Sequence, residues 1–77
     1  MQMNLNQLRV FFFVAQEKSI TRAAERLFVT QPAVTMQIRA MEEQLSLKLF
    51  KRHGRVLELT EGGRVVFEYA RKIFSIV

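Results

Sequence analysis

The 77-residue chain contains no cysteine, no aspartate, one proline and one histidine, His53. Without cysteine the chain forms no disulfide framework and no thiolate metal site, which fits a reducing compartment and predicts a cytoplasmic protein. With a single histidine and no aspartate, it offers neither a Ser-His-Asp arrangement nor the usual ligands of a zinc site. Glu42 and Glu43 are helical neighbours that point apart, so they do not form a carboxylate pair for acid-base work. We therefore expect no catalytic residue, no metal and no cofactor.

Long apolar runs are also missing. No stretch approaches the length that spans a membrane, and the first six residues lack the basic and apolar regions of a secretion signal. A membrane-surface helix would need a denser basic face than Arg64, Arg71 and Lys72 give the last segment. We expect no membrane partner.

Positive charge is abundant. Twelve lysines and arginines stand against seven glutamates, and the net charge of +5 favours a polyanionic partner. Residues 48–55 hold Lys48, Lys51, Arg52 and Arg55 without an acidic residue. From charge alone this window is equally a solvated basic loop, but its place directly after a pair of predicted helices favours contact with DNA.

The apolar spacing of residues 19–45 predicts two short helices joined by a tight turn. Thr30 can cap the second helix, and Pro32 is tolerated in its first turn because the amides there have no intrahelical acceptor. The apolar stripes that face each other are Ala23, Ala24 and Leu27 in the first helix and Val34, Ile38, Met41 and Leu45 in the second. Gln31, Thr35, Met36 and Arg39 then lie outside, around the half of the second helix that enters a major groove.

Three further elements flank this pair. Asn4 or Asn6 can cap a first helix that runs to about Lys18. Residues 49–52 and 56–59 read as a short hairpin, or wing, whose Gly54 can take a positive φ. Thr60 can cap a last helix that continues to the end of the chain, and the helix start is a candidate anion site.

The first and last helices have more apolar surface than one core needs. The first is apolar nearly all round, and the last has an apolar arc of roughly 200° where a one-sided helix needs roughly 100°. We therefore expect a homodimer, in preference to burial inside one small domain. The expected interface residues are Val10, Phe13 and Val14 in the first helix and Val66, Phe67, Ala70, Ile73, Phe74 and Val77 in the last.

The chain closely resembles the amino-terminal DNA-binding region of the LysR-type transcriptional regulators, over essentially its whole length. The resemblance is carried by Leu8-Arg9, Phe11, Val14 and Ala15, by residues 19–27, by residues 29–35, by Gln37-Ile38, by residues 42–45, by residues 49–52 and by residues 59–63. It implies a mainly α fold: a winged helix-turn-helix of three helices and a short β-hairpin wing over residues 1–59, and a long linker helix for dimerisation over residues 60–77.

The resemblance also implies partners and contacts. A separate domain beyond residue 77 would bind a small-molecule effector, and the full protein would form further tetramer contacts. Gln31, Pro32 and Thr35 would meet base edges and the adjoining backbone, and Arg55 would reach the minor groove. Thr35 stands where the family more often has serine, and Met36 stands where many members have arginine. Met36 could instead meet a thymine methyl group.

Phosphate contacts position a protein on DNA, whereas base contacts specify the site. We expect Gln31, Thr35 and Arg39 to read bases, with Pro32 and Met36 beside them; Arg39 could instead pair with Glu42 or Glu43. The expected backbone contacts are Thr21, Arg22, Thr30, Lys51, Arg52 and Thr60. The predicted function is sequence-specific binding of double-stranded DNA at an interrupted inverted repeat. The alternative is a winged-helix protein-interaction module, which would lack a steep salt dependence of duplex binding.

Overall fold

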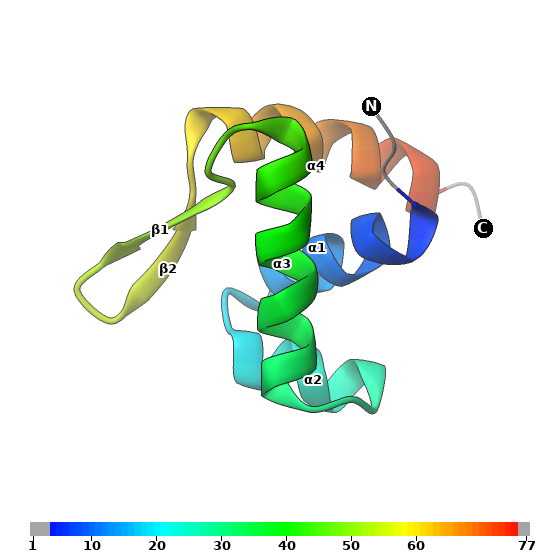
Figure 1. Cartoon of the computed structure of the whole chain (residues 1–77), viewed down its shortest axis with the longest axis vertical. Helices are drawn as coiled ribbons and strands as arrows, with labels where there is room; N and C mark the ends of the chain where they lie inside the picture. Colours follow the sequence, from blue (N-terminus) through cyan, green and yellow to red (C-terminus); the bar gives the residue numbers. More distant parts are fainter. Residues whose placement is uncertain (1–3, 76–77) are drawn as a thin grey trace.

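The computed structural model describes residues 4–75, which form four helices and one two-stranded antiparallel sheet (Figure 1). In chain order the elements are α1 (Leu5–Glu17), α2 (Ile20–Leu27), α3 (Gln31–Leu45), β1 (Phe50–His53), β2 (Val56–Leu59) and α4 (Glu61–Phe74). The hairpin projects to one side of α3, and α4 runs across the end of the molecule opposite α2 (Figure 1). This arrangement confirms the mainly α, winged helix-turn-helix fold with a following long helix.

Every helix begins at a side chain that caps it. The first cap is Asn4 rather than Asn6, and the second is Ser19. Such caps satisfy amides that have no acceptor inside the helix. The bonds run from the amides of Gln7, Arg22, Ala33 and Gly63 to the side-chain oxygens of Asn4, Ser19, Thr30 and Thr60, over 2.7, 3.1, 3.3 and 3.0 Å. The predicted starts of α3 and α4 are therefore confirmed.

Three helices end on a left-handed residue that is not glycine. These residues are Lys18, Phe28 and Ser46, with φ of 54°, 58° and 56°. The left-handed residue turns the chain sharply and returns its own amide to the last helical carbonyls. At Phe28 this geometry makes the tight turn between α2 and α3, and it leaves the phenyl ring almost entirely exposed.

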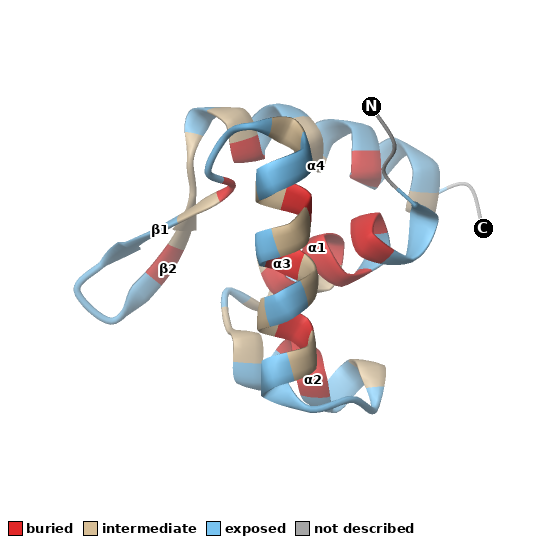
Figure 2. Cartoon of the chain, in the orientation of Figure 1, coloured by how far each residue is buried: buried red, intermediate tan, exposed pale blue. Residues whose placement is uncertain are grey.

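The core forms around α1, which contributes six buried residues (Figure 2). Phe11 and Val14 are fully covered, and α2, α3 and α4 all contact this helix. The predicted stripes of the helix pair meet as expected, since Ala23, Ala24 and Val34 belong to the same buried cluster. The other three helices thus cover most of the apolar surface of α1, while Leu5, Arg9 and Gln16 remain exposed.

This packing corrects part of the predicted dimer interface. Val10, Val14 and Ala70 are buried within the chain itself, so they leave almost no surface for a second copy. Val66, Phe67 and Phe74 are partly buried against the same core. Phe12 draws this side of α4 onto α1, because its ring centroid lies 5.4 Å from that of Phe67 and 5.3 Å from that of Phe74. Val77 lies outside the described residues.

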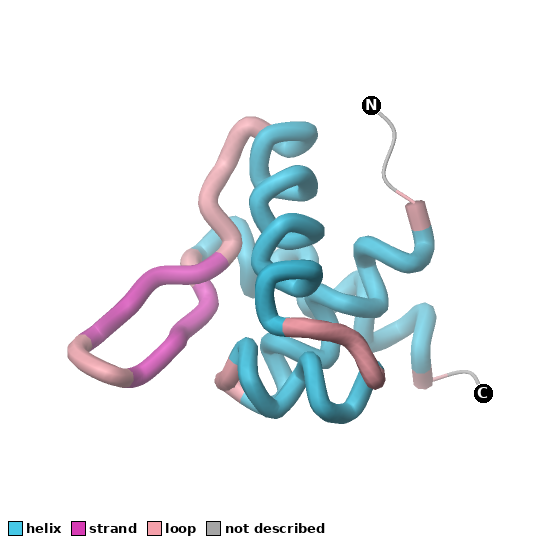
Figure 3. Tube along the Cα trace, turned by 60° about the horizontal axis from the view of Figure 1, so that its bottom comes forward, coloured by secondary structure: helices cyan, strands magenta, loops and turns pink. Residues whose placement is uncertain are grey.

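The hairpin is joined to the helices at its base. The ring of Phe50 lies 5.3 Å from that of the buried Phe11, and Leu57 is itself buried. The Glu42 carboxylate accepts a hydrogen bond from the Leu49 amide over 2.8 Å, which links the end of α3 to the start of the wing. A Cβ at Gly63 would overlap the carbonyl oxygen of Leu49, so glycine allows α4 to begin against the residue that precedes β1. The rest of the hairpin extends away from the helices (Figure 3).

The register pairs Phe50 with Leu59 at the base and His53 with Val56 at the tip. Gly54 makes the turn between the strands with φ of 66°, a conformation in which a side chain would be strained. The wing predicted from the sequence is therefore confirmed, with its strands shifted by a single residue at most. Within residues 4–75, no helix has both the length and the apolar character needed to cross a bilayer.

Candidate nucleic-acid interface

Helix α3 presents its amino-terminal half to solvent. Val34, Ile38 and Met41 lie on its inner side in the core, so the residues between them must face outward. Gln31, Pro32, Met36 and Arg39 are exposed, and Thr35 is half-buried. The structure thus brings together all five residues predicted to read bases.

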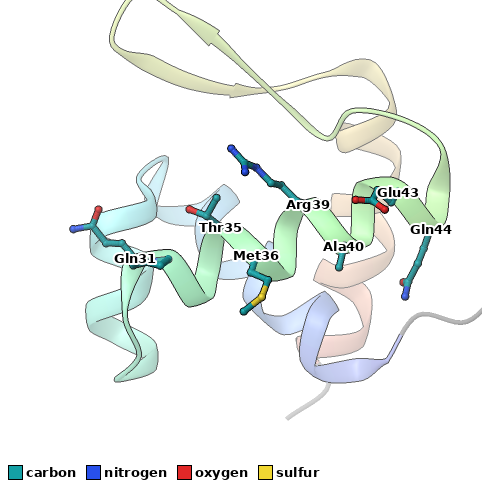
Figure 4. A pocket seen from close by; sticks show the side chains of 8 residues that line it. Gln31, Thr35, Met36, Arg39, Ala40, Glu43 and Gln44 are labelled. Carbon is teal, nitrogen blue, oxygen red and sulfur yellow. The ribbon is translucent and has the colours of Figure 1, made fainter.

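These five residues line one shallow surface hollow along α3. The remaining residues of the hollow are Ala40, Glu43 and Gln44, nearer the carboxyl end of the helix (Figure 4). Thr35 and Arg39 project on the side of α3 where the hairpin lies, whereas Met36 and Ala40 project on the opposite side (Figure 4). The exposed surface of α3 therefore has a polar edge beside the wing and an apolar edge away from it.

Arg39 is available for an external partner. The ion pairs within residues 4–75 do not include it. Glu42, one of its two predicted partners, is held by the Leu49 amide and lies 3.9 Å from the Lys48 ammonium. The side chain of Glu42 is mostly covered, so it serves the connection between α3 and the wing.

The cations predicted to contact the DNA backbone or the minor groove are exposed. Arg22 lies in the first turn of α2, and Lys51, Arg52 and Arg55 belong to the wing. None of the four takes part in an ion pair within the described part of the chain. Glu58 is the acidic residue of the hairpin, and its carboxylate lies 3.6 Å from His53. The wing therefore keeps a net positive charge that its own residues leave uncompensated.

The three threonines predicted to contact the DNA backbone differ in their availability. Thr21 is exposed near the start of α2. Thr30 caps α3 as an acceptor, which leaves its hydroxyl proton free to donate. Thr60 both accepts from the Gly63 amide and donates to the carbonyl of Lys48, so its hydroxyl already holds α4 against the wing. The groups at this end of α4 that remain able to bind an anion are the free backbone amides of its first turn.

Other cations have structural partners. Arg26 donates to Glu17 over 2.8 Å and lies over the ring of Phe13, 4.3 Å from its centroid. The guanidinium of Arg9 lies 5.2 Å from the same centroid. Phe13, predicted at the dimer interface, thus helps to join α1 to α2, a role that the sequence pattern did not signal. Cation-aromatic contacts of this kind contribute about 0.5–1 kcal/mol at exposed sites.

On α4, the Arg71 guanidinium donates to the Glu68 carboxylate over 2.8 Å. This hydrogen bond and the charge of Arg71 lower the pKa of Glu68 from its ordinary value. Both side chains lie on the exposed surface of α4, away from the residues that line α3. No three His or Glu side chains within residues 4–75 lie close enough together to hold a metal ion.

A helix pair with an exposed second helix, followed by a basic hairpin, defines the winged helix-turn-helix class. The chain belongs to the lysR family of bacterial regulatory helix-turn-helix proteins, whose family model matches residues 5–64. The fold agrees with solved structures. It superposes on BenM DBD in a complex with catB site 1 DNA with a TM-score of 0.90 and 38% identity, over 95% of this chain and 81% of that one. For the CbnR DBD–DNA complex the TM-score is 0.87 and the identity is 39%, over 96% of this chain and 85% of that one.

Curated relatives include a transcriptional regulator and a transcriptional activator. The chain is 53% identical over 73 residues to the RuBisCO operon transcriptional regulator of Allochromatium vinosum, covering 95% of this chain and 24% of that protein. It is 55% identical over 71 residues to the glycine cleavage system transcriptional activator of Escherichia coli K12, covering 92% of this chain and 23% of that protein. The chain thus spans about a quarter of the length of these relatives.

Proposed function

We propose that this chain binds double-stranded DNA sequence-specifically as the reading unit of a LysR-type transcriptional regulator. The observation that carries the proposal is the exposed amino-terminal half of α3, where Gln31, Thr35 and Arg39 lie beside a wing with unpaired cations. An α-helix fits the major groove, where each base pair shows a distinct pattern of donors and acceptors. The complexes of BenM DBD and CbnR DBD with DNA support the same use of this fold.

The proposed contacts divide by chemistry. Gln31, Pro32, Thr35, Met36 and Arg39 meet base edges in the major groove, and Arg55 reaches from the wing tip towards the minor groove. The groups that hold phosphates are Thr21, Arg22, Thr30, Lys51, Arg52 and the amino end of α4 at Thr60. Helix amino ends favour anions because their first amides are free and the helix dipole is positive there.

We further propose that two copies pair through α4, with a corrected surface. Val65, Tyr69 and Ile73 recur at every fourth position on the outer side of this helix, with 59%, 64% and 43% of their surface exposed. Of the interface residues predicted from the sequence, Ile73 lies on this outer stripe. Sedimentation should show a concentration-dependent dimer that Tyr69→Glu weakens, with Glu68→Gln as the matched control. A dimer unaffected by Tyr69→Glu would place the pairing surface elsewhere.

The family supports the rest of the assignment. Residues 1–59 act as the DNA-reading domain and residues 60–77 as the linker helix of a longer cytoplasmic regulator. A separate domain of that protein binds a small-molecule effector, and the full-length protein forms tetramers in addition to dimers. The length of the relatives, about four times that of this chain, leaves room for such a domain.

Selection of bound duplexes from a random pool tests the function. The expected product is an interrupted inverted repeat, because twofold pairing places two recognition helices in successive major grooves. Affinity for the selected duplex should fall steeply with salt, since phosphate contacts release counterions. A pool without enrichment, together with weak salt dependence, would favour the protein-interaction module instead.

A further inference from the structure

The apolar edge of α3 is a regular surface feature. Pro32, Met36 and Ala40 follow one another at intervals of four residues, which places them in one line along the helix. Met36 and Ala40 project away from the wing, on the side opposite Thr35 and Arg39 (Figure 4). All three line the same hollow as the polar residues. The proposed DNA-facing surface therefore has an apolar half as well as a polar half.

The fold gives Met36 no structural task. It is 65% exposed, and it is absent from the buried cluster and from the partly buried apolar residues that pack against it. The buried residues on the core-facing side of α3 are Val34, Ile38 and Met41. Met36 is therefore free to contact a partner at the centre of the proposed DNA-facing surface.

The major groove of DNA offers few apolar groups. The C5-methyl group of thymine is the one that unmodified base pairs present there, and a 5-methylcytosine would present the same group. A flexible, polarisable thioether side chain adapts well to such a small apolar target. A guanidinium at this position would favour the acceptors of guanine instead.

We infer that Met36, flanked by Pro32, makes the recognition surface specific for a thymine methyl group in each half-site. This inference rests on the proposed DNA binding and names the chemistry of part of its site. The polar edge formed by Gln31, Thr35 and Arg39 reads donors and acceptors on the side near the wing. The apolar edge reads a 5-methylpyrimidine on the far side.

Replacing thymine by deoxyuracil removes this methyl group and leaves the pairing edge unchanged. In the selected duplex, each thymine of one half-site is replaced in turn, and the affinity of the unaltered chain is measured. At the position that Met36 contacts, affinity should fall about fourfold, which corresponds to losing the burial of one methyl-sized group. For Met36→Ala, thymine and deoxyuracil at that position should bind equally well.

Thr35 supplies the matched control, because its own methyl group can also meet a thymine. Thr35→Ser keeps the hydroxyl and deletes that methyl. The preference for thymine over deoxyuracil should survive Thr35→Ser and disappear in Met36→Ala. The reverse pattern would overturn the assignment to Met36. Both variants change residues outside the buried cluster, so both should fold.

The test separates this inference from the function beneath it. A selected consensus in which no thymine depends on Met36 would overturn the inference and leave sequence-specific DNA binding intact. Failure to obtain any consensus would overturn the proposed function and this inference together. An affinity loss in Met36→Ala that is equal for all duplexes would assign the residue to general surface contact and also overturn the inference.

Discussion

The recognition helix α3 and the wing carry the proposed DNA contacts, yet the chain holds them differently. α3 places Val34, Ile38 and Met41 in the core, so its outward residues have positions fixed by close packing. Among the strand residues of the wing, only Leu57 is buried, and the tip is exposed. Base reading requires fixed geometry, whereas phosphate attraction requires mainly charge. The two regions therefore suit different parts of recognition.

The largest expected effect comes from a residue that supports both regions. Phe11 is fully buried in the core against which α3 packs, and its ring contacts Phe50 at the base of the wing. Phe11→Ala should lower the free energy of unfolding by about 3–5 kcal/mol, because it removes buried surface and leaves a cavity. Chemical denaturation measures this loss. Met36→Ala is the control and should change stability by about 0.5 kcal/mol or less; similar losses in both would contradict the division between core and surface.

The second-largest loss of stability should be confined to the wing. Glu42→Ala removes the acceptor of the Leu49 amide and should cost about 1.5–3 kcal/mol, the range for hydrogen bonds to charged groups. Amide hydrogen exchange should rise at Leu49 and along β1 and stay unchanged in α1. Glu42→Gln keeps an acceptor oxygen and should restore most of the protection. Uniform exchange throughout the chain would show that Glu42 supports the whole fold instead of the wing.

A smaller effect should distinguish charge from geometry. Arg52→Ala should weaken binding to selected and scrambled duplexes alike and reduce the salt slope by about one, because one phosphate contact is lost. Arg71→Ala removes the same charge from the chain, but Arg71 is paired with Glu68 on α4. The Arg71 variant should leave the slope unchanged. Equal slopes in the two variants would attribute the effect of Arg52 to net charge.

The smallest effect concerns neither region. Arg71 lowers the pKa of Glu68 in the folded chain below the ordinary 4.5. The pair therefore contributes stability above that ordinary value, and the contribution is lost as pH falls through the lowered pKa. Because both groups are exposed, unfolding curves of Glu68→Gln and the unaltered chain should nearly coincide at neutral pH and converge further in acid. A large difference at neutral pH would contradict the exposed position of the pair.

The elements that local chemistry determines were predictable from the sequence. The caps at Thr30 and Thr60, the facing stripes of α2 and α3, and the Gly54 turn of the wing were all confirmed. Each depends on residue types close together in the chain. The same reasoning grouped Gln31, Thr35, Met36 and Arg39 on one surface, because helical spacing alone places them there.

Features that depend on tertiary packing were not predictable. The wide apolar arc of α4 predicted two partners for this helix, but not which side meets its own chain. Phe12 decides this by stacking on Phe67, so the outer stripe is formed by Val65, Tyr69 and Ile73. The left-handed backbone conformation of Lys18, Phe28 and Ser46, the residues on which three helices end, was also not predictable from the sequence, because none of them is glycine.

The central claim is that the amino end of α3 reads bases. Binding of the unaltered chain and Gln31→Ala to a selected duplex and to a scrambled duplex tests it most directly. Gln31→Ala should reduce the discrimination between the two duplexes by about 1–3 kcal/mol, while affinity for the scrambled duplex changes little. An equal loss of affinity for both duplexes would contradict base reading by this end of the helix.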